Sequence, residues 1–96
     1  MNTRDLEYLV AVAEELHFGR AATRCNASQP ALSGQLRKLE ERLGVTLFER
    51  TKRHVGLTGI GGRIVGQARE ILRNVAAMEQ LAAAHKDPLV GACRIG

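Results

Sequence analysis

Residues 21–41, AATRCNASQPALSGQLRKLEE, contain the pattern that decides the fold. A helix carrying Ala21 and Ala22 ends in a tight corner at residues 25–27, and a second helix then begins at Ser28. Leucines at steps of four, three and four give the second helix an apolar inner face, whereas its outer face is polar and basic. Two helices joined by so short a corner predict a helix-turn-helix whose second helix contacts DNA bases.

Capping residues mark the ends of the helices around this motif. Residues 2–16 place their apolar side chains on one helical face, and Asn2 with Asp5 predicts a capping box at the start. Ser28 is a good N-cap for the next long helix, and Gly44 can end it in a left-handed cap. We therefore expect the first helix, the helix through Ala21 and the helix from Ser28 to fill the chain before residue 45.

A β-hairpin is predicted directly after these helices. Residues 47–50 and 54–57 have the composition of short strands, and the connection between them is polar and basic. A hairpin of this size is not stable alone, so it must pack against the helices. The fold class is thus mainly α, a winged helix-turn-helix over residues 1–57 with the hairpin as its wing.

A long helix is expected to follow, capped by Thr58 and running to residue 86. Apolar residues recur at alternating steps of four and three and form one stripe along the helix. Such spacing is typical of a helix that pairs with a second helix. A second stripe can pack on the chain's own core, so we interpret residues 58–86 as a linker helix that forms a homodimer. The alternative is one wide stripe that packs entirely within the chain. The predicted dimer seam is Ile64, Ala68, Ile71, Val75, Met78 and Ala82.

The composition excludes several classes of protein. With 96 residues and only 3% aromatic ones, the chain is one small domain with an aliphatic core, which suits helices. It has no apolar run long enough to cross a bilayer and no signal-peptide pattern, so we expect a soluble, cytoplasmic protein without membrane contact. Cys25 and Cys93 form no metal or disulfide pattern, and no cofactor is indicated. Residues 87–96 end the helix and then resemble a first strand, which we interpret as the start of a truncated C-terminal regulatory domain.

Positive charge is concentrated around the predicted motif. The net charge of the chain is +4, yet residues 17–63 contain nine Lys and Arg against three Glu. This concentration is typical of a protein that binds a polyanion, because each neutralised phosphate releases counterions. A solvated, generally basic surface is the alternative, and the helix-turn-helix pattern favours double-stranded DNA.

The predicted DNA contacts fall into two groups. In the major groove, Gln can bond adenine in two places and small apolar groups can contact a thymine methyl. Hydroxyl and basic side chains hold phosphates or enter the minor groove. Because a dimer presents these residues twice, the operator should be near-palindromic. The base-contacting group is Gln29, Pro30, Ala31, Ser33 and Gln35; the backbone or minor-groove group is Ser28, Arg37, Lys38, Arg50, Lys52, Arg53 and Thr58.

Other roles remain open for some of these residues and for the chain. Arg37 can pair with a glutamate on its own helix, and Arg20 and Arg24 can form salt bridges as readily as phosphate contacts. A winged helix can also be a protein-interaction module, whose long helix binds another protein and whose basic hairpin is dispensable. An enzyme is disfavoured, because the histidines lie in different elements and no nucleophile, phosphate-loop or zinc spacing is present.

Several segments together carry a family resemblance: Asp5–Leu9, Phe18–Ala22, Ser28–Ser33, Leu43–Val45, Leu47–Arg50, and Leu57-Thr58 with Gly61. They are similar to the N-terminal domain of LysR-type transcriptional regulators, and the resemblance covers essentially the whole chain. It implies homodimers joined by antiparallel linker helices, often assembled into tetramers, that bind interrupted inverted repeats and activate or repress transcription. RNA polymerase is then a candidate partner. The resemblance also implies a larger C-terminal domain that senses an effector or the redox state.

The runs Arg4–Val10 and Ser33–Glu40 look like the peroxide-sensing subgroup of this family. That resemblance implies an activator that responds to hydrogen peroxide, with its redox cysteines in the C-terminal domain rather than at Cys25 or Cys93. A LysR-type regulator of another pathway, responding to a small-molecule effector, is the alternative. The chain departs from the family pattern at Gly34, where most members carry a basic residue.

Overall fold

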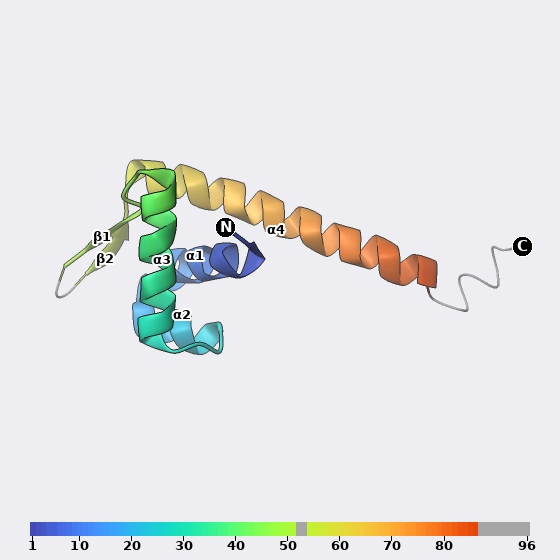
Figure 1. Ribbon diagram of the computed structural model, residues 1–96, viewed down its shortest axis with the longest axis horizontal. Helices are drawn as coiled ribbons and strands as arrows, with labels where there is room; N and C mark the ends of the chain where they lie inside the picture. Colours follow the sequence, from blue (N-terminus) through green and yellow to red (C-terminus); the bar gives the residue numbers. More distant parts are fainter. Residues whose placement is uncertain (52–53, 87–96) are drawn as a thin grey trace, which may run out of the picture.

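The computed structural model describes residues 1–51 and 54–86. Figure 1 shows three helices gathered into one body, a β-hairpin projecting from it as a wing, and a last helix leaving it as a long rod. This architecture confirms the predicted mainly α-helical winged helix-turn-helix with a long helix after it. The strand predicted within residues 87–96 lies outside the described residues. The elements are α1 (Thr3–Glu15), α2 (Phe18–Arg24), α3 (Gln29–Leu43), β1 (Phe48–Arg50), β2 (Val55–Leu57) and α4 (Gly59–Lys86).

The ends of α1 and α3 carry the caps that the sequence predicts. The Asn2 side chain accepts the Asp5 N–H at 3.0 Å, and the Asp5 carboxylate accepts the Asn2 N–H at 3.2 Å. Ser28 Oγ accepts the Ala31 N–H at 3.2 Å, and Gly44 ends α3 with a φ of 74°. These caps satisfy backbone groups that helix ends leave unpaired, so they fix where α3 begins and ends.

The corner between α1 and α2 contains two features without a signal in the sequence. Leu16 ends α1 in the left-handed region, with a φ of 50°. His17 caps α2, because its Nδ1 accepts the Arg20 N–H at 3.0 Å. Leu is not a preferred residue at a left-handed C-cap, and His is not a preferred N-cap. Capping preferences therefore predict neither feature.

The wing is a two-stranded antiparallel hairpin. Phe48 lies opposite Leu57 and Arg50 opposite Val55, and the Thr51 N–H donates to the His54 carbonyl at 2.8 Å. Phe48 is only 2% exposed, so it anchors the wing in the core, as a hairpin of this size requires. The predicted tip residues Lys52 and Arg53 lie outside the described residues.

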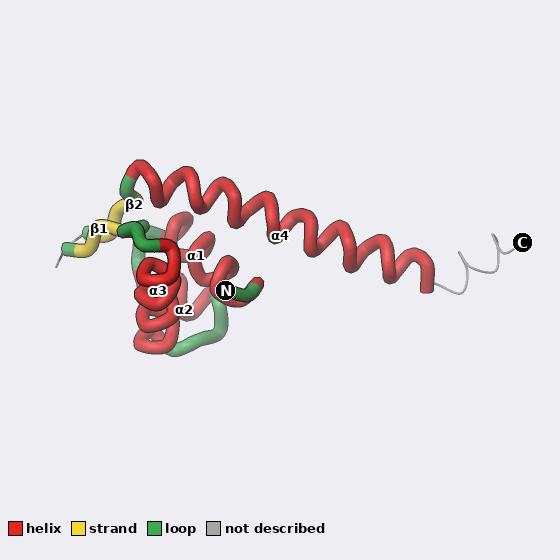
Figure 2. The backbone as a smooth tube through the Cα atoms, turned by 45° about the horizontal axis from the view of Figure 1, so that its top comes forward, coloured by secondary structure: helices red, strands yellow, loops and turns green. Residues whose placement is uncertain are grey.

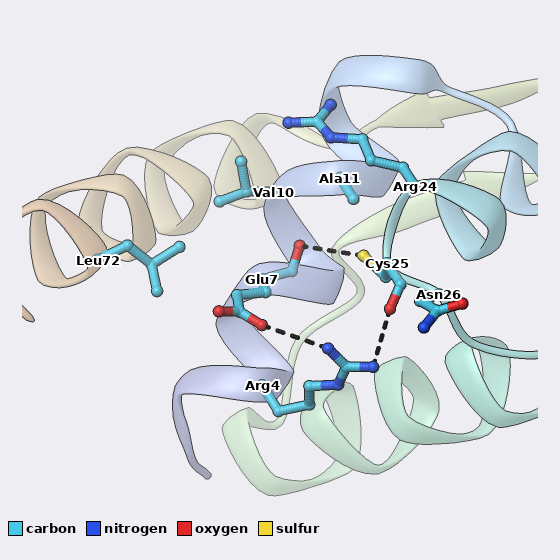
Figure 3. A pocket seen from close by; sticks show the side chains of 8 residues that line it. All are labelled: Arg4, Glu7, Val10, Ala11, Arg24, Cys25, Asn26 and Leu72. Carbon is cyan, nitrogen blue, oxygen red and sulfur yellow. Dashed lines mark hydrogen bonds and ion pairs between the residues drawn. The ribbon is translucent and has the colours of Figure 1, made fainter. Parts of the chain in front are cut away.

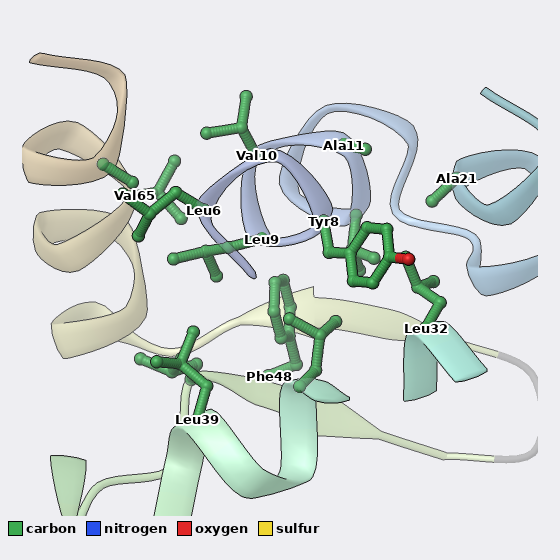
Figure 4. Packing of buried hydrophobic residues seen from close by; sticks show 14 of the residues in the cluster. Leu6, Tyr8, Leu9, Val10, Ala11, Ala21, Leu32, Leu39, Phe48 and Val65 are labelled. Atoms are coloured by element: carbon green, nitrogen blue, oxygen red, sulfur yellow. The ribbon is translucent and has the colours of Figure 1, made fainter. Parts of the chain in front are cut away.

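The core holds α3 against α1, α2 and the wing. Figure 4 shows aliphatic side chains from these elements converging around Phe48. Leu32, Leu36 and Leu9 are 0% exposed, and burial of one such side chain contributes about 1.5–3 kcal/mol. Because the leucines of α3 point inward, its opposite side is presented to solvent.

Only the first half of α4 packs on the rest of the chain. Val65 and Ala68 are each 1% exposed, and Leu72 is half-buried against the core. From residue 73 to residue 86, every side chain except Val75 is exposed. Figure 2 shows this second half extending away from the other helices, which gives the molecule a long dimension of 61 Å.

The predicted dimer seam needs a correction at its beginning. Ala68 is buried within the single chain, so it cannot contribute surface to a dimer, and Ile64 packs against the core. Spacing alone does not separate these faces, because both are apolar where α4 passes α1. Farther along, Ile71 and Met78 are 44% and 68% exposed, as a seam requires. Leu81, which the predicted seam omits, is 73% exposed.

Candidate nucleic-acid interface

The solvent side of α3 carries the residues that we predict to contact bases. Gln29, Pro30 and Ala31 are exposed in its first turn, Gln35 is exposed one turn on, and Ser33 is half-buried. A side-chain Cβ built at Gly34 would meet no atom within 4 Å, so this surface is open. The structure therefore places these residues on the accessible surface of a single helix, with Gln29 on the flank beside the wing and Gln35 on the flank beside the start of α1.

The basic residues of α3 make no ion pairs with carboxylates in the part of the chain that the structure describes. Arg37, Lys38 and Arg42 are exposed. Arg37 was free to pair with Glu40 or Glu41; Glu40 instead pairs with Arg50. Arg42 was not among the predicted contacts, although its position one turn after Lys38 was a signal for it. Positive charge on this helix thus faces solvent without internal compensation.

The arginines of α2, in contrast, are paired with acids of α1. Arg20 Nε lies 3.5 Å from Glu15, and Arg24 pairs with both Glu14 and Glu15. Arg69 of α4 lies 3.2 Å from Glu14. The hydrogen bond from Arg24 is the main cause that lowers the pKa of Glu14 from its ordinary value, and it raises the pKa of Arg24. Of the two roles open for Arg20 and Arg24, the structure favours salt bridges.

Arg50 of the wing also has a partner within the chain. Its Nη2 lies 3.1 Å from Glu40 Oε1, and its guanidinium carbon lies 5.2 Å from the centre of the Phe18 ring. Its side chain is 25% exposed. The predicted contact of Arg50 with the DNA backbone or minor groove therefore competes with internal bonds. From the sequence alone, Glu40 was not identified as the partner of Arg50.

The hydroxyl groups of Thr58 and Ser28, both predicted to contact phosphates, differ in how far they are already hydrogen-bonded within the chain. Thr58 Oγ1 donates to the Thr46 carbonyl at 2.7 Å and accepts the Gly61 N–H at 2.9 Å, so it is engaged in both directions. Ser28 Oγ accepts one N–H and remains exposed. A phosphate contact therefore fits Ser28 better than Thr58.

A hollow of about 360 Å³ lies beside Gln29, where the starts of α2 and α3 meet the wing. A Cβ at Gly19 would lie 2.9 Å from His17 Cε1, so the absence of a side chain there leaves room for the histidine ring. His17 and His54, which the sequence assigns to different elements, both line this hollow. Its lining is Leu16, His17, Phe18, Gly19, Gln29, Thr51, His54 and Val55.

A second hollow, of about 310 Å³, contains Cys25 and is shown in Figure 3. Arg4 donates to the Cys25 carbonyl at 2.8 Å and pairs with Glu7, and Cys25 Sγ lies 3.9 Å from the Glu7 carbonyl. Burial raises the pKa of the Cys25 thiol, which disfavours its thiolate form. Within residues 1–51 and 54–86, no group of three or more potential metal ligands is found.

No helix among the described residues is both long enough and apolar enough to cross a membrane.

Comparison with known families gives a match over most of the described fold. The family model described as "Bacterial regulatory helix-turn-helix protein, lysR family" matches residues 3–62. This range begins with α1 and ends in the first turn of α4. It includes every element of the winged helix-turn-helix.

Curated relatives match the whole chain. It is 53% identical over 96 residues to the DNA-binding transcriptional dual regulator OxyR of Escherichia coli strain K12. It is 52% identical over the same length to a hydrogen peroxide-inducible genes activator of Haemophilus influenzae. In both cases the match covers 100% of this chain and 32% of the relative. The chain therefore spans about a third of the length of these relatives. AlsR of Bacillus subtilis is 50% identical over 85% of this chain and 27% of its own length.

Solved structures have the same fold. A full-length OxyR variant from Pseudomonas aeruginosa superposes with a TM-score of 0.88 at 48% identity, over 93% of this chain and 30% of that chain. The BenM DBD in complex with benA site 1 DNA superposes with a TM-score of 0.85 at 39% identity, over 91% of this chain and 98% of that chain. The chain belongs to the lysR family of bacterial regulatory helix-turn-helix proteins and, as the sequence predicted, is the DNA-binding domain of a transcription regulator rather than an enzyme.

Proposed function

We propose that this chain is the DNA-binding part of a LysR-type transcription regulator and that α3 enters the major groove of double-stranded DNA. This proposal rests on which basic side chains are paired with acids within the chain and which are not. Arg37, Lys38 and Arg42 are exposed on α3 without ion pairs among the described residues, whereas the arginines of α2 are compensated by α1. A cation without an internal partner can neutralise a phosphate and release its counterion.

The roles of individual residues follow from their places on α3 and the wing. Gln29, Pro30, Ala31, Ser33 and Gln35 contact base edges, since they occupy the open side of the helix. Ser28 and the basic residues of α3 hold phosphates on either side of the groove. Lys52 and Arg53, by their position in the sequence at the wing tip, enter the minor groove or contact the flanking backbone. The BenM DBD, at 39% identity, is solved in complex with benA site 1 DNA, which supports DNA binding by this fold.

We also propose a homodimer formed through the outer face of α4. Ile71, Met78 and Leu81 are all exposed on a face of the helix that its own domain does not cover. Large apolar side chains in such a row are stabilised when a second helix covers them. The dimer presents one α3 from each protomer, so the operator is near-palindromic. A tetramer and contact with RNA polymerase rest on the family resemblance alone.

For the longer protein, we propose activation of transcription in response to hydrogen peroxide, in the bacterial cytoplasm. Identity of 52–53% over the whole chain to relatives named as hydrogen peroxide-inducible genes activators supports this proposal. The alternative is a different effector, because AlsR is 50% identical over most of the same residues. Transcription from a promoter bound by the full-length protein should rise after peroxide is added. Induction by another small molecule, with none by peroxide, would favour the alternative.

A footprint on genomic promoter DNA tests the DNA-binding proposal. We expect two protected patches on one face of the duplex, separated by one helical turn, about 10–10.5 base pairs, or by multiples of it. Uniform coating would indicate binding without sequence preference. Absence of binding would favour the protein-interaction module. Sedimentation of the free chain tests the dimer separately, since it needs no DNA.

A further inference from the structure

Glu40 ties the wing to α3 through both of its carboxylate oxygens. Its Oε2 accepts the backbone N–H groups of Leu47 and Phe48 at 2.7 and 3.2 Å, and its Oε1 accepts the Arg50 guanidinium at 3.1 Å. The Glu40 side chain is only 14% exposed. One acid therefore holds the start of β1 and the end of the same strand.

Arg50 completes this arrangement from the other side. Its guanidinium lies over the ring of Phe18 at 5.2 Å, within the range of a cation–π contact. Phe18 in turn meets Phe48 edge to face, with ring centres 6.4 Å apart. Arg50 Nε is buried and has no hydrogen-bond partner among the described residues. The side chain thus connects the wing with α2 and α3, and we call Glu40, Arg50 and Phe18 the wing latch.

A DNA phosphate that took the Arg50 guanidinium as its main partner would draw it out of the wing latch. The Glu40 carboxylate would then be left without its cation in a mostly buried position, which is unfavourable. No such cost applies to Arg37, which is exposed and forms no ion pair in the described part of the chain. Basic residues of the same type therefore have different functions in this domain.

We propose that Arg50 is a positioning residue of the DNA-binding surface and not a DNA ligand. It fixes the angle at which β1 and β2 leave the helices, so the two strands lie beside the duplex while α3 lies in the groove. This inference rests on the proposed DNA-binding function. It reverses the role that the basic hairpin pattern suggests for Arg50.

The effect of Glu40→Gln on DNA affinity distinguishes the two roles by its sign. If Arg50 positions the wing, loss of the ion pair loosens the wing and weakens binding by about 3–10-fold. If Arg50 contacts a phosphate, removal of a nearby negative charge releases the arginine and tightens binding. The Gln oxygen can still accept the N–H groups at the start of β1, while its NH2 group cannot accept from Arg50, so the substitution removes both the ion pair and the hydrogen bond to Arg50. Tighter binding by Glu40→Gln overturns the proposal.

The salt dependence of binding provides the second readout. Arg50→Gln should weaken binding by a similar factor and leave the slope of log K against log salt unchanged. Arg37→Gln, the matched variant on α3, should flatten that slope by about 0.9, the value for one lost phosphate contact. The double variant of Glu40→Gln and Arg50→Gln should lose less affinity than the sum of the two single losses, since both break the same ion pair. A flatter slope for Arg50→Gln overturns the proposal.

Failure of the DNA-binding proposal itself is recognised separately, because the unchanged protein would then bind no duplex. The wing latch is still tested in that case by amide hydrogen exchange of the free chain. Glu40→Gln and Arg50→Gln should both speed exchange at Leu47 and Phe48 at least several-fold, while the N–H groups within α1 stay unchanged. Unchanged exchange at these two amides overturns the positioning role.

Discussion

Glu14 of α1 accepts a hydrogen bond from Arg69 of α4 at 3.2 Å, across 55 positions in the chain. The same carboxylate pairs with Arg24 of α2. One side chain therefore joins the helix-turn-helix to the long helix that we propose forms the dimer. All three side chains are 38–46% exposed, so the bridge supports apolar packing that is already present, and its own contribution is modest.

Glu14→Gln should lower stability in a pH-dependent way. The pKa of Glu14 in the folded chain lies below its ordinary value of 4.5, mainly through the hydrogen bond from Arg24. A lowered folded-state pKa means that the stabilisation is present above the ordinary value and is lost as the pH falls through the lowered one. At pH 7 we expect a loss of about 0.5 kcal/mol, or roughly 2–4 °C in melting temperature. Melting curves at several pH values check this, and the difference from the unchanged chain should vanish in acid.

The control for this prediction is Glu7→Gln. Glu7 pairs only with Arg4 on its own helix among the described residues, so it joins no two elements. At pH 7, Glu7→Gln should change the melting temperature less than Glu14→Gln does. Equal effects of both substitutions, or a Glu14 effect that persists at low pH, would contradict the bridge between α1, α2 and α4.

Gly61→Ala should destabilise the chain where α4 begins. A Cβ there would lie 2.1 Å from the Leu47 carbonyl oxygen, and a backbone atom cannot easily give way. Overpacking of this kind costs about 1–3 kcal/mol. Gly62→Ala is the matched control, because a Cβ at Gly62 meets nothing within 4 Å. As Ala favours a helix over Gly, that variant should gain about 0.5–1 kcal/mol. Urea unfolding of both variants checks the prediction. Gly61→Ala should lower the free energy of unfolding and Gly62→Ala should raise it.

Met78→Glu should weaken self-association. Met78 is 68% exposed in the single chain and lies near the middle of the proposed dimer face. A charge placed in a helix–helix seam must be desolvated, which disfavours the dimer. Gln80→Glu adds the same charge at another exposed position of α4 outside the seam and should have little effect. Sedimentation equilibrium checks both variants. A dimer that tolerates Glu at position 78 would place the interface elsewhere.

Local patterns account for most of the fold that the sequence predicts. The capping box at Asn2, the caps at Ser28 and Gly44, and the spacing of the α3 leucines all depend on residues within a few positions of one another. Such relationships can be recognised in a linear sequence, because helix geometry fixes which neighbours meet. The helices and the wing follow from them.

The candidate site was predictable only where it depends on exposure of one helix. The open side of α3 follows from its own periodicity, so Gln29 and Arg37 are found where expected. The partners of Arg50 do not follow, because Phe18 and Glu40 reach it through the packing of separate elements. Ala68 shows the same limit, since an apolar residue on α4 fits the core as well as a dimer seam. Charge and spacing indicate what a side chain can do, and tertiary packing decides which partner it has.

Gln29→Ala should weaken binding to the cognate operator by about 1–3 kcal/mol and leave binding to unrelated DNA nearly unchanged. Gln29 is exposed in the first turn of α3, where a helix in the major groove brings its side chains to base edges. Its loss removes hydrogen bonds that only the correct base can make, whereas phosphate contacts are kept. Titration of both DNAs at one salt concentration checks this. Arg37→Ala is the comparison, because losing a phosphate contact should weaken both DNAs by a similar factor. Equal losses on both DNAs for Gln29→Ala would show that this glutamine does not read the sequence.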